Sequence, residues 1–303
     1  MKKRLFIALT LLLGTFLAPA TAAEPAQPSI AVIDVGMNLF KESVTTEACF
    51  VEYGTCPNGK KEMVGPGAAN LPTQKVNSLF DHGTQMASVI LSVNPKAKLI
   101  PIRIMGTDAQ GTSMIYSLEA VTKALDWIIA NQATYNIQVV NISQGGIKPN
   151  CEVPSNMKKQ VATLKTMNVP VISATGNNSN YQQVNSPACL DDVVSVGATD
   201  NPYAGGGFMY DKDAKPTIAK YSNGWASVDF YLNGRWYVTN LNGSRKFSAG
   251  TSNATASLSA WWLLNKKNSF DETYNSILST TTQINNQYLS GKYVYLPFAP
   301  LKG

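Results

Sequence analysis

Short apolar runs alternate with segments of helical period along most of this chain, and this alternation is the feature that most constrains its fold. The apolar runs are strand-sized and continuous, and they lie at residues 29–34, 99–104, 138–143, 169–174 and 193–196. Apolar residues at helical spacing lie between these runs and again at residues 251–264. Continuous apolar strands separated by helices are typical of a parallel sheet that is buried on both faces. We therefore predict an α/β fold with a doubly wound, mostly parallel sheet and helices on both faces.

Two stretches depart from this pattern. Residues 41–80 are polar and rich in Gly, Pro, Asn and Thr, which predicts a long irregular loop insertion. Beyond residue 200, three Asn-Gly pairs predict C-terminal β-hairpins, at Asn223-Gly224, Asn233-Gly234 and Asn242-Gly243. Because 303 residues suit one large domain, we expect residues 24–303 to form a single one, with its last helix at 251–264.

The N-terminus predicts export. A positive segment of Lys2, Lys3 and Arg4 precedes 14 apolar residues, 5–18, and an A-x-A pattern at Ala20-Thr21-Ala22. The apolar stretch is shorter than the ~20 residues of a membrane-spanning helix, so a cleaved signal peptide over residues 1–23 is favoured over an uncleaved anchor. The expected location is the periplasm or the medium, with no membrane anchor after cleavage.

Charge and histidine content exclude several function classes. The net charge is +6, but without residues 1–23 it falls to 22 basic against 19 acidic residues, or +3. This small surplus, with no basic stripe, gives no case for nucleic-acid binding. A single histidine excludes a multi-histidine metal site, and we expect no metal-binding residues.

Four cysteines in an exported chain favour disulfides over free structural thiols. Of the three pairings that four cysteines permit, we favour Cys49 with Cys56, which closes a short loop containing Gly and Pro. Cys151 and Cys189, both in predicted loops after strands, would form the second pair.

Three chemistry-bearing residues stand near glycines where predicted strands end or helices begin. Asp34 ends the first strand, and His82 and Ser252 open helices. Ligands of parallel sheets bind beyond the carboxyl ends of the strands. A nucleophilic serine needs a base to take its proton, and that base needs an acid to orient it. Each residue alone is more ordinary, as a turn former, a packed histidine or a helix cap. Their occurrence together, in the order Asp, His, Ser, points to nucleophilic catalysis.

The segments around these residues resemble the motifs of the subtilisin-like serine proteases, the subtilases. The family's D-[ST]-G, H-G-T-H and G-T-S-x-A-x-P motifs are matched by Asp34-Val35-Gly36, His82-Gly83-Thr84-Gln85 and Gly250-Thr251-Ser252-Asn253-Ala254-Thr255-Ala256. Its A-A-G-N and N-[MI]-S-x-G motifs are matched by Ala174-Thr175-Gly176-Asn177 and Asn141-Ile142-Ser143-Gln144-Gly145. Two further segments, Ser186-Pro187-Ala188 and Tyr221-Ser222-Asn223-Gly224, also match in order. The resemblance spans residues 30 to about 280.

This resemblance implies a serine endopeptidase that acts on protein or peptide substrates as a monomer. In this reading Ser252 is the nucleophile, His82 the base, Asp34 the residue that orients it, and Asn177 an oxyanion donor together with the Ser252 amide. The substrate would lie extended beside Ser143, Gln144, Gly145, Ala174 and Gly176, which belong to these motifs, with Gly111 and Thr112 on its other side. No cofactor is required. Structural Ca²⁺ is compatible with the resemblance, but no D-x-[DN]-x-[DN]-G loop occurs and no site is mapped.

The departures from the family pattern keep an alternative open. Val35 replaces a hydroxyl residue beside the aspartate, Gln85 replaces the second motif histidine, and Ala256 replaces a proline. No propeptide is recognisable between residue 23 and the first strand. The alternative is a pseudoprotease that binds peptides without cleaving them. An esterase is disfavoured because no G-x-S-x-G motif occurs and the order of the three residues differs.

Overall fold

The computed structural model describes residues 26–71, 80–108, 114–200, 216–224 and 228–294. The predicted signal peptide at 1–23 lies outside these ranges, as do Gly111 and Thr112. Within the described residues, no helix combines the length and the apolar character needed to cross a membrane.

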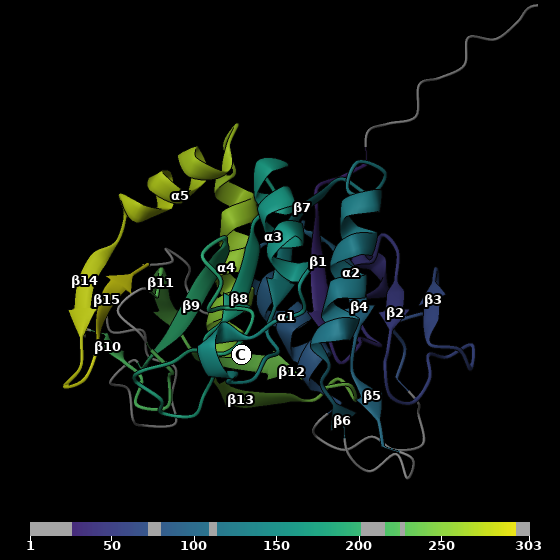
Figure 1. Cartoon of the computed structure of the whole chain (residues 1–303), viewed down its shortest axis with the longest axis horizontal. Helices are drawn as coiled ribbons and strands as arrows, with labels where there is room; N and C mark the ends of the chain where they lie inside the picture. Colours follow the sequence, from purple (N-terminus) through teal and green to yellow (C-terminus); the bar gives the residue numbers. More distant parts are fainter. Residues whose placement is uncertain (1–25, 72–79, 109–113, 201–215, 225–227, 295–303) are drawn as a thin grey trace, which may run out of the picture.

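One large sheet forms the centre of the molecule (Figure 1). Its core is parallel, and the strands lie side by side in the order β11 (Phe230–Asn233), β9 (Val193–Asp200), β8 (Val171–Ala174), β7 (Ile137–Ile142), β1 (Ser29–Asp34) and β4 (Lys98–Arg103). The first strand, β1, thus lies in the interior of the sheet between β7 and β4. The carboxyl ends of these parallel strands meet at one edge, where a site is expected.

Helices cover both faces of this sheet, as predicted. Along β1, the side chains of Ile30 and Val32 join one apolar cluster, and those of Ala31 and Ile33 join the other. The first cluster packs under α1 (His82–Val93), α4 (Thr251–Asn265) and α5 (Phe270–Leu278); the second packs under α2 (Leu118–Asn131) and α3 (Met157–Thr166). Because successive strand residues point to opposite faces, a continuous apolar run is what a doubly covered sheet requires.

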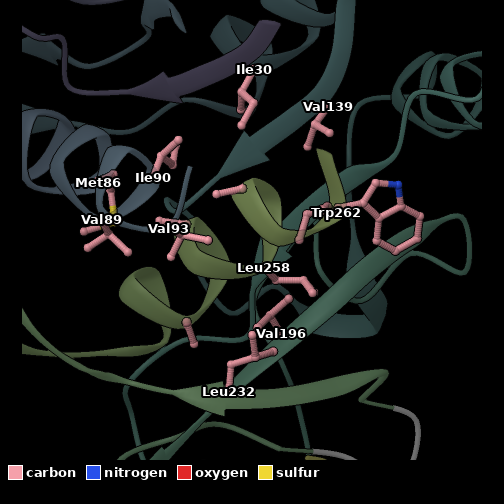
Figure 2. Close-up of a cluster of buried hydrophobic side chains, with 14 of the residues drawn as sticks. Ile30, Met86, Val89, Ile90, Val93, Val139, Val196, Leu232, Leu258 and Trp262 are labelled. Carbon is pink, nitrogen blue, oxygen red and sulfur yellow. The ribbon is translucent and has the colours of Figure 1, made fainter. Parts of the chain in front are cut away.

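Helix α4 lies deep in the first layer, where its apolar side chains join the cluster drawn in Figure 2. Every residue from Thr251 to Ala260 is buried, so these first ten residues of the helix have no face turned to solvent. Two of its buried serines donate to its own backbone, Ser257 Oγ to Ala254 O and Ser259 Oγ to Thr255 O. Small residues in this part of the helix allow close packing on the sheet, and its N-terminus is thereby fixed at the sheet's carboxyl edge.

Residues 41–71, the described part of the predicted insertion apart from Phe80, are not the irregular loop that the composition predicts, and residues 72–79 lie outside the described ranges. Residues 41–71 contain the short 3₁₀ helix η1 (Lys41–Ser43) and two strands that extend the sheet, β2 (Ala48–Phe50) paired parallel to β4 and β3 (Glu62–Val64) paired antiparallel to β2. The run Ala48 to Val51 is buried. Three-residue strands are too short to stand out in a polar segment, and sheet pairing rather than local preference forms them.

The prediction of hairpins at Asn-Gly pairs is correct at one pair only. Asn242-Gly243 turns the hairpin of β12 (Arg235–Thr239) and β13 (Arg245–Ala249), and Gly243 has a φ of +80°. Asn233-Gly234 instead links β11 to β12, and Asn223 is buried, with its side chain bonded to a neighbouring loop. Neither Gly224 nor Gly234 has the positive φ that a two-residue hairpin turn requires.

The C-terminal part contains elements beyond those expected. Helix α5 follows α4, so the predicted last helix is not the last, and a second hairpin pairs β14 (Thr282–Asn285) with β15 (Ser290–Tyr293). The short elements β5 (Gly106–Thr107), β6 (Met114–Ile115), β10 (Thr217–Ile218) and η2 (Pro149–Cys151) complete the described fold.

The structure forms both disulfides that the sequence favours, Cys49–Cys56 and Cys151–Cys189. They close loops of very different length, with sequence separations of 7 and 38 residues. Since a cross-link restricts the unfolded chain more when its loop is longer, the second disulfide stabilises the fold more.

Replacing each pair by alanine tests this order. On the loop-closure argument, Cys151→Ala/Cys189→Ala should lower the free energy of unfolding by about 4 kcal/mol, and Cys49→Ala/Cys56→Ala by about 2 kcal/mol. Denaturant unfolding under non-reducing conditions measures both losses. Two or more alkylatable thiols in the unfolded wild-type protein would show that a disulfide is missing, whereas a Cys49–Cys151 link would contradict only the pairing.

Candidate active site

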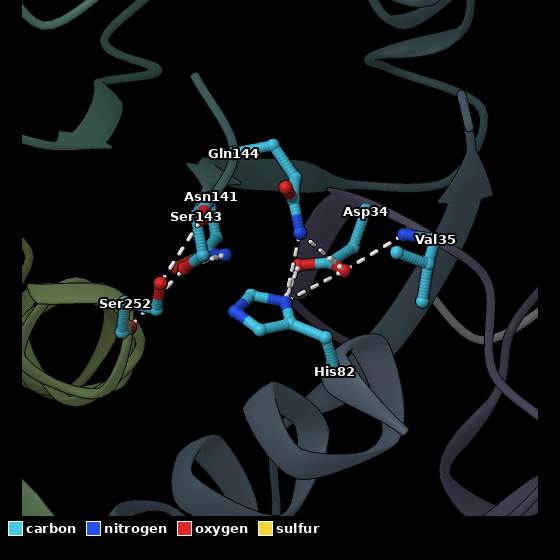
Figure 3. A network of polar contacts seen from close by, with 7 residues as sticks. All are labelled: Asp34, Val35, His82, Asn141, Ser143, Gln144 and Ser252. Carbon is cyan, nitrogen blue, oxygen red and sulfur yellow. Dashed lines mark hydrogen bonds and ion pairs between the residues drawn. The ribbon is translucent and has the colours of Figure 1, made fainter. Parts of the chain in front are cut away.

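Asp34 is the last residue of β1 and lies at the carboxyl edge of the sheet (Figure 3). Its side chain is 1% exposed, and its Oδ1 accepts a hydrogen bond from the Val35 backbone N–H at 2.7 Å. Its carbonyl oxygen accepts from Ile104 N at 2.9 Å, next to the parallel strand β4. The sheet therefore holds the carboxylate from behind and leaves it facing α1.

His82 is the first residue of α1, and its Nδ1 lies 2.9 Å from both carboxylate oxygens of Asp34. The two residues meet because two glycines let their backbones approach. A Cβ on Gly83 would collide with the carbonyl oxygen of Gly36, and Gly36 itself has a φ of +118°. Larger residues at either position would push the start of α1 away from the end of β1.

Opposing effects act on the pKa of His82. Burial disfavours the charged imidazolium and lowers the pKa, while the negative charge of Asp34 and its hydrogen bond raise it; the charge of Lys246 lowers it. The effect of Asp34 is the stronger, and the pKa lies above the ordinary histidine value of 6.5. The protonated ring is therefore stabilised at this position.

Ser252 is the second residue of α4 and is almost fully buried. Its Oγ donates to the Ser143 carbonyl at 3.1 Å, and Ser143 Oγ donates to the Ser252 carbonyl at 3.2 Å. Among the hydrogen bonds of the described residues, none joins Ser252 to His82. The Nε2 side of the His82 ring nevertheless faces Ser252 across the site (Figure 3).

Asn177 lies in the loop after β8, and Thr251 fixes the orientation of its amide. Thr251 donates to Asn177 Oδ1 twice, from its backbone N at 2.9 Å and from its Oγ1 at 3.0 Å. Because Oδ1 accepts from both donors, Nδ2 is left to donate to another group, and it lies near Gly250 at the start of α4. The backbone N–H of Ser252 belongs to the first turn of α4, whose N–H groups lack partners within the helix.

The sequence did not reveal what holds this loop. Asn223, fully buried, accepts at Oδ1 from the backbone N–H groups of Asn178 and Asn180, at 2.8 and 3.0 Å. Its Nδ2 donates to the Thr175 carbonyl at 3.0 Å. Gly176 has a φ of +103°, and a Cβ there would collide with Asn223. The loop that carries Asn177 is therefore pinned on both sides of that residue.

A pocket of about 270 Å³ connects these groups. It is lined by five of the residues expected to bind substrate, Ser143, Gln144, Gly145, Ala174 and Gly176, and by His82, Asn177, Asn178, Asn185, Thr251 and Ser252. Asp34 lies behind His82 rather than on the wall. Asn185 had no motif signal of its own, because only the fold brings it against Gly145 and Gly176.

The sequence gives no sign of where the side chain of Gln144 points. Its Nε2 lies 3.1 Å from Asp34 Oδ1 and 2.9 Å from His82 Nδ1, so the amide covers the Asp34–His82 pair (Figure 3).

The described ranges contain no group of three or more His, Cys, Asp and Glu side chains placed to bind a metal ion.

Comparison with known proteins places this arrangement in a family. A model of the subtilase family matches residues 26–293. The minor extracellular protease Epr of Bacillus subtilis (strain 168) is 24% identical over 233 residues, 74% of this chain and 32% of the relative. A cuticle-degrading serine protease of Arthrobotrys oligospora is 24% identical over 251 residues, 80% of this chain and 53% of the relative. The chain thus spans about a third to a half of the length of these relatives.

Solved structures share the fold. One described as an S41 psychrophilic protease has a TM-score of 0.67 at 18% identity and covers 91% of this chain and 92% of its own. A cold adapted subtilisin-like serine proteinase has a TM-score of 0.63 at 19% identity, with 90% of each chain covered. The sheet and its helical layers are therefore those of a subtilisin-like α/β fold.

The opposing effects on His82 can be separated by NMR, because the chain has one histidine. We expect the imidazole of the wild-type protein to titrate above pH 6.5. Asp34→Asn removes the charge that raises the pKa and leaves burial and Lys246, so the midpoint should fall below 6.5. Lys246→Gln should move it the other way. An unchanged midpoint in Asp34→Asn would refute the assigned balance.

Proposed function

The chain belongs to the subtilase family, and on this basis we propose that it is a serine endopeptidase that hydrolyses peptide bonds through an acyl-enzyme intermediate. The observation that carries the proposal is the convergence of Ser252, His82 and Asn177 on one pocket, with Asp34 bonded to His82 behind it. The three side chains come from α4, α1 and the loop after β8, elements far apart in the sequence.

In the proposed reaction Ser252 Oγ attacks the substrate carbonyl and His82 Nε2 takes its proton. The Nδ1–H of His82 stays bonded to Asp34, whose charge stabilises the imidazolium. His82 then gives the proton to the leaving amine. A water molecule next gives a proton to His82 as it attacks the acyl-enzyme, and His82 returns that proton to Ser252 Oγ as the acid product leaves. No cofactor takes part in these steps.

The hydrogen bond that Ser252 now makes suggests how substrate starts the reaction. An extended peptide that adds a strand beside Ser143–Gly145 would donate a backbone N–H to the carbonyl of Ser143. This carbonyl is the acceptor that Ser252 Oγ uses in the absence of substrate. Its occupation by a peptide N–H would release the hydroxyl, which then turns to Nε2 of His82.

Charge develops on the carbonyl oxygen during this attack, and two donors are placed to receive it. They are Nδ2 of Asn177 and the backbone N–H of Ser252, supported by the positive N-terminal end of α4. Since the oxygen becomes an anion only in the tetrahedral intermediate, these donors stabilise the transition state more than the bound substrate.

We also propose that the protein is exported and acts on proteins or peptides as a monomer. The predicted signal peptide and the two disulfides support export, because disulfides persist in oxidising compartments. Minor extracellular protease Epr, one of the relatives, is extracellular by name.

A fluorophosphonate probe tests the nucleophile. The wild-type protein should be labelled at Ser252, with loss of the fluoride, and should cleave an unfolded protein substrate. Ser252→Ala should lose both properties while keeping its melting temperature, and Ser257→Ala on the same helix should keep both. A wild-type protein that binds peptides but neither reacts nor cleaves would replace this proposal with the peptide-binding alternative.

Asn177→Ala tests the oxyanion donor. Loss of one such donor lowers kcat by about 10²–10³ in a subtilisin, and we expect the same order here with KM little changed. The exposed Asn156, whose side chain makes no cap hydrogen bond, gives a matched control in Asn156→Ala. A variant with normal kcat and a lowered melting temperature would make Asn177 a purely structural residue.

A further inference from the structure

Gln144 makes contacts that the proposed reaction does not yet use. It follows β7 on the segment Ser143–Gly145, and its side chain folds over the Asp34–His82 pair. The amide Nε2 is 3.1 Å from Asp34 Oδ1. It is the one side-chain donor to Asp34, apart from His82, among the hydrogen bonds of the described residues.

A buried carboxylate needs donors, because each unpaired oxygen lone pair carries a desolvation cost. The neighbouring residue supplies little here. Val35 gives only its backbone N–H, and its side chain is 1% exposed within the apolar cluster that also contains Ile33 and Ile104. The hydroxyl that stands at this position in the family motif is missing, so among the described residues the amide of Gln144 is the side-chain donor that Asp34 has besides His82.

We propose that Gln144 is a positioning residue, whose amide N–H donates to Asp34 and holds the carboxylate and the His82 ring in the orientation that catalysis requires. This inference rests on the proposed function, and it concerns the same site. The observation that supports it is the close contact of Gln144 Nε2 with Asp34 Oδ1 and His82 Nδ1.

Two groups approach Nδ1 of His82: the amide Nε2 of Gln144 at 2.9 Å and the carboxylate of Asp34. Their positions indicate which ring nitrogen of His82 carries the proton. If Nδ1 accepted from Gln144, its lone pair would face both oxygens of the Asp34 carboxylate at 2.9 Å, which is repulsive. With a proton on Nδ1, both N–H groups point to the carboxylate, and Nε2 of His82 is left to accept the proton of Ser252. The Asp34 carboxylate thus favours the tautomer that the base needs, and the amide of Gln144 contributes by donating to that carboxylate.

The same geometry predicts an electrostatic effect on His82. The N–H dipole of Gln144 presents its positive end to both Asp34 and Nδ1, so it opposes a positive charge on the ring. The charged groups that act on His82 are Asp34 from β1 and Lys246 from β13. Removing the amide leaves both in place and should raise the midpoint of the His82 titration.

Gln144→Met is the test, because methionine keeps the length of the side chain and excludes water but has no donor. We expect kcat to fall by about 10- to 100-fold, the equivalent of one hydrogen bond to a charged group, with KM changed only a few-fold. The NMR midpoint of His82 should rise. Gln144→Leu should behave in the same way, and Gln283→Met, exposed on the distant strand β14, should change nothing.

The outcomes separate this inference from the proposed function. If the wild-type protein reacts with the fluorophosphonate but both Gln144 variants keep its kcat and its His82 midpoint, the positioning role is wrong. A raised KM with unchanged kcat overturns it too, because Gln144 would then be a substrate contact. If the wild-type protein does not react at all, the proposed function fails, while a shifted midpoint in Gln144→Met still supports the contact with the pair.

Discussion

The packing of α4 against the central sheet is the interaction on which the rest of the site depends. Ten successive residues from Thr251 are buried, so the helix cannot shift without opening the core. Its N-terminus therefore has one position, at the carboxyl edge of β7 and β8. Ser252 meets Ser143 there, and Thr251 orients Asn177. A nucleophile on a loop would lack this constraint. The two oxyanion donors, Asn177 Nδ2 and the Ser252 N–H, would then no longer be held by the same helix.

Close backbone contacts set the second half of the site in the same way. Gly36 and Gly83 let the end of β1 touch the start of α1, and the distance between Asp34 and His82 follows from that contact. Burying an imidazolium is the largest single effect on the ring and lowers its pKa, but the charge of the buried Asp34 and its hydrogen bond together outweigh that cost. Packing, rather than the side chains alone, makes this pair an effective one.

The sequence predicts much of the fold from its apolar pattern and much of the site from its motifs. Strands such as β1 and β8 are continuous apolar runs, and the family motifs carry Asp34, His82 and Ser252 in order. The short strands β2 and β3, the helix α5 and the hairpin β14–β15 have weak local signals and form through tertiary pairing. Asn185 has no motif of its own, and the Asn223-Gly224 pair indicates a hairpin turn; only the folded loops show what the two amides contact.

Gln144 shows why motif matching stops short of mechanism. The family pattern leaves its position variable, so the sequence predicted only a backbone role for it beside substrate. Val35, one residue after Asp34, was visible as a departure but its consequence was not, since the chain gives no sign of which side chain stands nearest the carboxylate. In the fold β7 lies next to β1, and the residues that follow them share the sheet's carboxyl edge. Adjacent parallel strands thus let a donor 110 residues away serve Asp34 where its sequence neighbour offers no hydroxyl.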